Sequence, residues 1–270
     1  MTNNPADTSN DVLLTDVSDR IGTLTLHRPA VRNALSNKLL ARLREGMAEL
    51  DARDDVDVLI LTGSDPAFSA GLDLKELGST GENLGGANDA PRSGGDDPSY
   101  PWATTVKPLI GAINGVAITG GFELALQCDF LVASDRAAFG DTHTRVGVLP
   151  GWGLSVLLPQ AIGYRRALEM SLTGNFMPAD EALHFGLVNH VVPHVDLIPT
   201  ARKLASDIVG NSQDGLRELL ASYRAIHRLS VGEGERHEAR VGRSWSKRTY
   251  DPAAVESRRL AIMARGRSQT

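Results

Sequence analysis

Two adjacent glycines and a nearby glutamate, within Thr119–Glu123, are the first residues of the chain that could carry out chemistry. They follow an apolar run and open a predicted helix, and the glycines let a ligand approach the backbone closely. The N–H groups of a first helical turn have no partners within the helix and can hold an oxyanion. Glu123 lies one turn inside and could face the same site as a base. The structural alternative makes Gly120 the N-cap and Glu123 only a capping side chain.

A second turn of small residues, in Ala67–Leu74, has the same setting. It follows the β-rich run Val56–Thr62 and precedes a predicted helix. Open α/β sheets bind ligands at the carboxyl ends of parallel strands, where both turns would lie. The chain has neither a GxGxxG nor a GxxxxGK[ST] sequence, which disfavours dinucleotide and nucleoside triphosphate sites.

The hydrophobic pattern around these turns predicts an α/β core. Two short strands in Val12–Leu26 precede a helix at Ser36–Arg53, capped by Ser36, and the strand Val56–Thr62. This order predicts a right-handed crossover and a parallel sheet. Further strands are predicted at Leu109–Ile113, Phe130–Ala133 and Leu187–Val192, and further helices at Gly120–Gln127, Gly153–Ala161, Arg165–Thr173 and Ala179–Phe185. Beyond Asp196 the pattern is helical, and no internal repeat is visible.

The segment Gly78–Ser99 differs from the rest in composition. It holds six glycines, and Leu84 is its only large apolar residue. Such a segment buries too little apolar surface to offset its ordering entropy. A mobile loop over a site and a solvent-facing insertion with no role are equally compatible with it.

Composition and charge narrow the class of protein. The 270 residues are 41% hydrophobic and 23% charged, as in an ordinary globular protein, and no apolar run could span a membrane. A net charge of −5 disfavours nucleic acid as the main partner. Cys128 is the only cysteine, so no internal disulfide forms, and the first residues do not resemble a secretory signal. Together these features predict a cytoplasmic protein.

Short segments across residues 12–195 resemble, in order and spacing, the motifs of the enoyl-CoA hydratase/isomerase (crotonase) family. These segments are His27–Leu35 (the entry motif), Ala67–Leu77 (the first oxyanion segment), Lys107–Asp129 (the second), Leu149–Gly151, Leu172–Gly174 and Ala182–Val188. The resemblance implies an α/β fold with a ββα spiral core in residues 1–200. It also implies a helical C-terminal oligomerisation region in residues 201–270.

The resemblance assigns roles to residues by position. The oxyanion hole for a thioester enolate would be the N–H groups of Leu72 and Gly120, and Glu123 would be the first catalytic glutamate. The residues expected to line the substrate site, mainly through backbone atoms, are Ala30, Val31, Ala70, Gly71, Gly121, Gly151 and Trp152. The family chemistry uses no metal and no separate cofactor, because coenzyme A enters as part of the substrate.

His143 is the chain's main departure from the family, because it stands where the hydratases have their second catalytic glutamate. Water addition to a 2-enoyl thioester needs a base for the water and an acid for the α-carbon. A histidine near pKa ~6.5 could serve as either. The alternative is a structural histidine satisfied by Asp141 or by a carbonyl. A smaller departure is Trp152, where small residues are common.

The most favoured activity is therefore that of an enoyl-CoA hydratase, a lyase of fatty acid metabolism. An isomerase that uses Glu123 alone and a CoA-ester binding protein without turnover remain alternatives. A hydrolase with a Ser69–His143 pair is a third, although the glycine near Ser69 fits an oxyanion turn better. The exact reaction, the acyl-chain length and the stereochemistry are not readable from the sequence.

The C-terminal region predicts the assembly. Residues 201–270 carry 14 Lys and Arg against 8 Asp and Glu, a balance of +6, whereas the first 200 residues carry 14 against 25, or −11. The apolar positions of this helical region need a cover. The resemblance implies a homotrimer or a dimer of trimers. The arginines either meet the phosphates of a neighbour's coenzyme A or simply decorate exposed helix faces.

Overall fold

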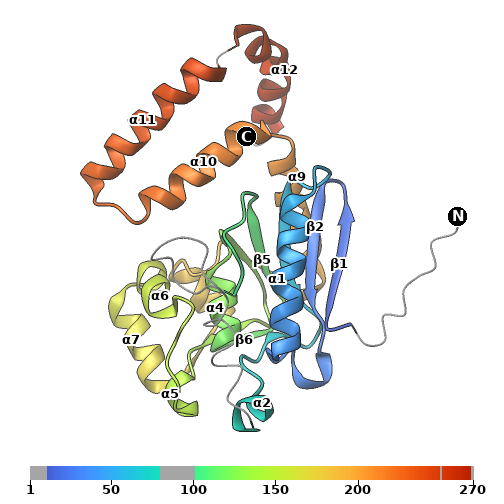
Figure 1. Ribbon diagram of the computed structural model, residues 1–270, viewed down its shortest axis with the longest axis vertical. Helices are drawn as coiled ribbons and strands as arrows, with labels where there is room; N and C mark the ends of the chain where they lie inside the picture. The colour runs from blue at the N-terminus through green and yellow to red at the C-terminus, as the bar shows by residue number, and fades with distance from the viewer. Residues whose placement is uncertain (1–10, 80–100, 250, 269–270) are drawn as a thin grey trace, which may run out of the picture. The chain divides into compact units, whose positions relative to one another are not determined.

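The computed structural model describes residues 11–79, 101–249 and 251–268 (Figure 1). Most of the predicted loop Gly78–Ser99 lies outside these residues. The chain forms two compact units, Met1–Gln213 and Asp214–Thr270, which we describe separately. No helix in the described residues is long and apolar enough to cross a membrane.

The first unit is built on a six-stranded sheet of order β1-β2-β3-β5-β7-β10. β1 (Leu13–Ser18) and β2 (Ile21–Leu26) form an antiparallel hairpin, and both residues of its turn, Asp19 and Arg20, have positive φ. α1 (Asn37–Ala52) then leads to β3 (Val58–Gly63), which pairs in parallel with β2 as predicted. The predicted cap is also confirmed, because the Ser36 hydroxyl accepts a bond from the N–H of Leu39 at 3.2 Å.

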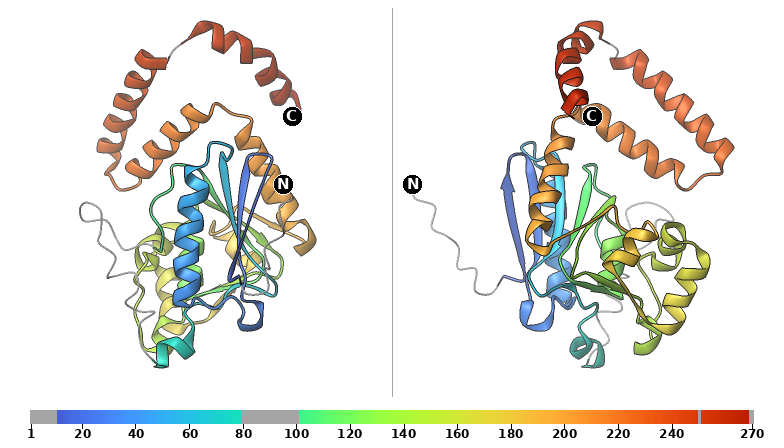
Figure 2. Two further views of the ribbon diagram at one scale, coloured as in Figure 1. Left: turned by 45° about the vertical axis from the view of Figure 1, so that its right-hand side comes forward. Right: turned by 180° about the vertical axis from the view of Figure 1, so that it is seen from behind.

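Both faces of this sheet are buried. Along β3, Leu59 and Leu61 join the core that includes α1, whereas Val58 and Ile60 join a second core with α9 (Leu197–Val209). The continuous apolar run of β3 is the pattern expected of a parallel strand covered on both sides. Figure 2 shows α1 crossing one face of the sheet and α9 crossing the other.

A smaller sheet of order β4-β6-β8-β9 is built from three-residue strands. Three successive segments of chain each place one strand in the large sheet, one in the small sheet and then a helix. They are β3, β4 (Ala67–Ser69) and α2 (Leu74–Ser79); β5 (Leu109–Ile113), β6 (Val116–Ile118) and α4 (Gly120–Leu126); and β7 (Phe130–Ser134), β8 (Ala138–Gly140) and α5 (His143–Val146). The expected ββα spiral core is therefore present.

The remaining helices follow the predicted order. They are α6 (Leu154–Ile162), α7 (Tyr164–Thr173) and α8 (Ala179–His184), with the short strand β9 (Phe176–Pro178) before α8 and β10 (His190–Val192) after it. β10 is shorter than the predicted strand Leu187–Val192. Because α9 packs on the large sheet, the first unit extends past residue 200 to Gln213. The second unit contains α10 (Gln213–Ile226) apart from its first residue, together with α11 (Val231–Thr249) and α12 (Pro252–Ser268).

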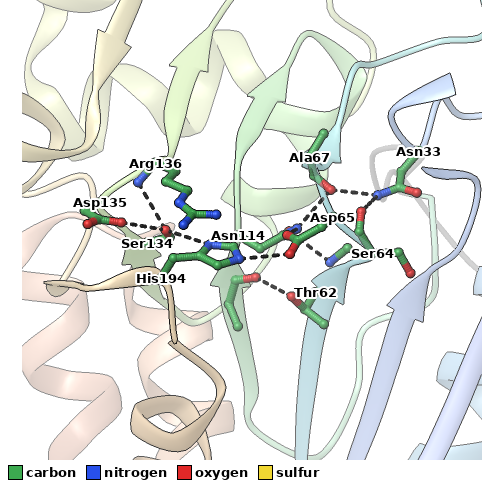
Figure 3. Close-up of polar contacts among 12 residues, drawn as sticks. Asn33, Thr62, Ser64, Asp65, Ala67, Asn114, Ser134, Asp135, Arg136 and His194 are labelled. Carbon is green, nitrogen blue, oxygen red and sulfur yellow. Dashed lines mark hydrogen bonds and ion pairs between the residues drawn. The ribbon is translucent and has the colours of Figure 1, made fainter. Parts of the chain in front are cut away.

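Polar side chains form hydrogen bonds between the corners where the chain passes from one sheet to the other (Figure 3). The Asn33 amide donates to the carbonyls of Ser64 and Ala67, both at 2.7 Å. The Asn114 amide donates to the Asp65 carboxylate at 3.0 Å. These bonds fix the corner from which β4 enters the site.

The ring of His194 connects this corner after β3 to the end of β7. Its Nε2 lies 3.0 Å from the Asp65 carboxylate, and its Nδ1 lies 3.0 Å from the Ser134 hydroxyl (Figure 3). The Ser134 side chain is fully buried, whereas the Asp65 side chain is 61% exposed. The serine is therefore out of reach of a substrate, and the contacts link the ends of β3 and β7 to the segment that precedes α9.

Candidate active site

The two glycine turns meet in the structure. A Cβ on Gly71 would lie 3.5 Å from the backbone nitrogen of Gly120 and only 2.8 Å from the carbonyl oxygen of Ile118. Gly71 also has φ +86°, so both space and conformation require glycine there. In the described part of the chain, the N–H groups of Leu72 and Gly120 donate to no other protein atom. The predicted pair of donors therefore comes from adjacent, conformationally fixed segments.

Thr119 holds the second turn in an unusual backbone conformation, with φ 54° and ψ −118°. Its N–H donates to the carbonyl of Gly140 at 2.9 Å, and its hydroxyl lies 2.6 Å from that of Thr142. Strain at a residue that is not glycine persists only where the surroundings hold it, and it is concentrated at functional sites. The two bonds connect the oxyanion turn to the segment that carries His143.

Glu123 does not cap its helix. One carboxylate oxygen accepts the N–H of Trp152 at 2.7 Å, and that of Leu154 more distantly at 3.4 Å. The other oxygen lies 3.4 Å from Nε2 of His143. Glu123 is only 2% exposed, so its carboxylate is held in a buried polar cluster one turn from the Gly120 N–H. The capping alternative is wrong.

His143 contacts two carboxylates, one at each ring nitrogen. Nδ1 lies 2.6 Å from Asp141, while Nε2 faces Glu123. Burial alone would lower the histidine's pKa, but the hydrogen bonds to Asp141 and Glu123 raise it to about 9. Burial is the largest single influence on the Asp141 carboxyl and would raise its pKa, but hydrogen bonds from His143 and Ser171 and the charge of His143 together lower the pKa. The ring is thus an imidazolium at neutral pH.

The sequence suggests Asp141 only as a partner for a structural histidine. The structure shows that satisfying Nδ1 leaves Nε2 pointing at Glu123. The Asp-x-His spacing was a readable signal, because the Asp141 carboxylate also accepts the backbone N–H of His143 at 3.1 Å. One carboxylate therefore fixes both the backbone and the ring of this residue.

The loop before α6 is held by α4. The N–H that donates to the Glu123 carboxylate belongs to Trp152. Gly151, which was predicted to line the substrate site, is exposed and takes no part in this hydrogen bond. The Trp152 carbonyl accepts a bond from the Gln127 side chain at 2.6 Å. Sequence reasoning missed Gln127, the C-cap residue of α4, which follows Glu123 by one turn.

The expected coenzyme A groove lies partly at the surface. Ala30 and Val31 are exposed, in a short 3₁₀ turn at Pro29–Val31. The Ala70 N–H donates to the carbonyl of Arg32 at 2.9 Å, which joins this turn to the first oxyanion segment. Gly121 is buried against Ser69, where a Cβ would lie 2.6 Å from the serine carbonyl. Gly121 thus serves close packing, and the binding roles of the groove residues stay predictions.

The hydrolase alternative finds no support in the geometry. The fully buried Ser69 hydroxyl donates to the carbonyl of Asn33 at 2.8 Å and accepts the N–H of Gly71 at 3.2 Å. His143 uses its ring nitrogens on Asp141 and Glu123 instead. No cluster of three or more metal-binding side chains occurs among the residues that the structure describes.

Comparison with known proteins identifies the family. The model of the enoyl-CoA hydratase/isomerase family matches residues 16–248. The chain is 37% identical to a probable enoyl-CoA hydratase of Mycobacterium leprae over 86% of this chain and 88% of that protein. It is 42% identical to a probable peroxisomal enoyl-CoA hydratase of Arabidopsis thaliana, over 73% and 72%.

Solved structures agree with this result. The chain is similar to the crystal structure of an enoyl-CoA hydratase from Mycobacterium tuberculosis, with a TM-score of 0.72 and 50% identity over 86% of this chain and 93% of that one. For a Geobacillus kaustophilus structure of this class the TM-score is 0.82, with 31% identity over 93% and 96%. The chain belongs to the enoyl-CoA hydratase/isomerase family.

Proposed function

We propose that this chain is an enoyl-CoA hydratase, which adds water across the double bond of a 2-enoyl-CoA thioester. The observation that carries the proposal is the contact between the Glu123 carboxylate and the His143 imidazolium beside two free N–H groups. Hydration needs both a base and an acid at the substrate, and this pair supplies one of each. The names of the relatives, probable enoyl-CoA hydratases, support the same reaction.

The thioester carbonyl would accept hydrogen bonds from the N–H groups of Leu72 and Gly120. Negative charge grows on this oxygen as water attacks the β-carbon and the enolate forms. Backbone donors held in advance stabilise that charge without reorganising during the reaction. The close packing of Gly71 on the Gly120 turn supplies this preorganisation.

The protons balance within the cluster. Glu123 takes one proton from the water while the water oxygen bonds to the β-carbon. Nε2–H of His143 gives a second proton to the α-carbon. The products are the 3-hydroxyacyl thioester, a neutral His143 and a protonated Glu123. Because the two groups are 3.4 Å apart, a proton can then return from Glu123 to His143 and restore the starting state.

In this scheme coenzyme A enters as part of the substrate, and the protein needs no further cofactor. Its adenine and pantetheine groups would follow the backbone of Ala30, Val31 and Ala70. The predicted homotrimer or dimer of trimers is also part of the proposal, and the exposed apolar residues of the second unit support it. The cytoplasmic location stays a prediction from the apolar runs, the first residues and the cysteine content of the sequence, and two relatives are named as peroxisomal and mitochondrial.

The direct test follows the loss of conjugated thioester absorbance when crotonyl-CoA is added to the enzyme. Glu123→Gln keeps the shape of the side chain but removes the base, so kcat should fall by about 10² to 10⁴ fold. Glu169→Gln removes an exposed carboxylate of α7 and should leave kcat unchanged. A Glu123→Gln variant with near-normal turnover would contradict the role of Glu123.

The same assay separates the alternatives. A one-base isomerase would convert a 3-enoyl-CoA into the conjugated ester and would not hydrate crotonyl-CoA. A binding protein would hold acyl-CoA without turnover. The pairing of Glu123 with a second charged group favours hydration over both.

A further inference from the structure

We propose that the indole of Trp152 closes the acyl end of the site and restricts this enzyme to short 2-enoyl-CoA esters such as crotonyl-CoA. This inference rests on the proposed function and deepens it, because it names the substrate class. It makes Trp152 a residue that determines specificity through its side chain, in addition to the backbone contact with Glu123.

The indole lies against the oxyanion turn. A Cβ on Gly120 would be 3.2 Å from Cζ3 of Trp152, 3.3 Å from Leu35 and 3.7 Å from Leu72. The three side chains therefore converge on the same glycine. Trp152 is only 8% exposed and belongs to the main hydrophobic core, as does the fully buried Leu35.

The backbone of Trp152 is fixed from both sides. Its N–H donates to Glu123 at 2.7 Å, and its carbonyl accepts from Gln127 at 2.6 Å. Gly153, the next residue, has φ +100° and is the N-cap of α6. Moving the indole aside by a shift of this loop would break the contact with Glu123. Core packing also restricts the ring, because protein interiors have few voids.

The reaction geometry places the acyl chain beside this ring. The carbonyl carbon must lie near Gly120, and the β-carbon must lie near Glu123 and His143. Trp152 touches both ends of this short path, Gly120 with its ring and Glu123 with its backbone. Because Trp152 spans the distance from Gly120 to Glu123, we expect carbon atoms beyond the β-carbon to meet the indole. A large rigid aromatic surface leaves room for a methyl group but obstructs a long chain.

The test compares crotonyl-CoA with 2-decenoyl-CoA. In the wild-type enzyme kcat/KM should be at least about tenfold higher for crotonyl-CoA, the size of effect expected when extra methylenes are forced into a packed site. Trp152→Ala retains the backbone N–H, so the ratio should shift by at least about tenfold toward the longer ester. Trp152→Phe should give an intermediate ratio.

Phe139→Leu is the matched control, because it also shrinks a buried aromatic ring of the same core, one that packs on Phe122. It should lower the Tm without changing the ratio of the two substrates. Equal wild-type kcat/KM for both esters would overturn the inference, as would an unchanged ratio in a folded Trp152→Ala variant.

Binding measurements keep this inference separate from the proposed function. If the wild-type enzyme hydrated no enoyl-CoA, the hydratase proposal would fail, but the saturated esters butyryl-CoA and decanoyl-CoA would still report on the site. The wild-type protein should bind butyryl-CoA more tightly relative to decanoyl-CoA than Trp152→Ala does. The same relative affinity in both proteins would reject a steric role for the indole.

Discussion

The charge state of His143 depends on its two neighbours. Asp141 holds Nδ1 and thereby directs Nε2 at Glu123, and both carboxylates stabilise the imidazolium. A glutamate at position 143 would instead face two carboxylates in a buried site, where one of them would become protonated. The histidine therefore supplies an acid without placing three like charges together.

The pH dependence of turnover tests this arrangement. With its pKa raised to about 9, His143 is charged below that pH and loses its proton above it. We expect kcat/KM to fall as the pH rises through about 9, rather than near neutrality as an unperturbed histidine would give. Asp141→Asn removes the strongest partner and should move the fall to lower pH. His143→Gln should lower turnover at least tenfold and abolish this alkaline limb.

The same shift has a consequence for stability. The pKa of the folded state lies above the unfolded value of about 6.5, so His143 stabilises the fold fully below that value and loses this contribution as the pH rises through about 9. Urea unfolding of wild type and His143→Gln should therefore differ more at pH 6 than at pH 10. In the kinetic experiment, a fall of kcat/KM at alkaline pH that persists in the His143→Gln variant would assign this fall to another group.

At the scale of elements, the corner after β3 depends on Asn33. This fully buried residue has φ 54°, and its amide group donates to Ser64 and Ala67 while its side-chain oxygen accepts the N–H of Arg28. Its own carbonyl accepts the Ser69 hydroxyl. One side chain thus connects the entry segment to β4, which leads to Gly71 and Leu72.

Substitutions at Asn33 should separate stability from conformation. Asn33→Gly accepts the positive φ but removes the side-chain amide. Because the carbonyls of Ser64 and Ala67 then lack this donor, the free energy of unfolding should fall by roughly 1–3 kcal/mol. Asn33→Asp should lose more, because a carboxylate would replace the donor that faces two carbonyl oxygens. Urea unfolding measures the loss of stability, and kcat reports the displaced oxyanion turn.

Asn175→Asp, at an exposed position, is the control for the change of charge and should have little effect. An Asn33→Asp variant as stable as the wild type would contradict the role of Asn33 as a donor.

Local sequence signals predicted the long elements well. α1, β3 and β5 were readable because each buries a regular apolar pattern of five or more residues. The strands of the small sheet were not, since three residues are too few to show a period of two. For the same reason the repeated ββα order is invisible in the sequence. The pairing of Leu72 with Gly120 came from the family resemblance, and Gln127 was missed because its contact with Trp152 joins separate elements.

At the scale of the whole molecule, the two units differ in charge and in surface. The first unit, residues 1–213, carries a net charge of −10, and the second unit, residues 214–270, carries +5. Helices of the second unit also expose large apolar side chains, among them Leu219, Tyr223, Val231, Leu260 and Ile262. Exposed apolar residues on several helices of one unit are typical of a surface that binds another protein. A second copy of this chain is the partner that the family resemblance favours.

Light scattering at micromolar concentration tests the assembly. We expect a mass about three or six times the chain mass of 28.9 kDa. Leu219 and Tyr223 are one helical turn apart on α10, and both are more than half exposed. The double substitution Leu219→Asp and Tyr223→Asp would place charges on this face. It should shift the mass toward the monomer, because burying unpaired charges in an interface is costly.

Gln160→Glu adds a charge at an exposed position of α6 and should leave the mass unchanged. If the monomer produced by the double substitution also loses its affinity for acyl-CoA, the arginine-rich unit of a neighbour would contribute to the site. Full affinity in that monomer would place the whole site within one chain. A wild-type protein of 28.9 kDa with full activity would contradict both the trimer and the shared site.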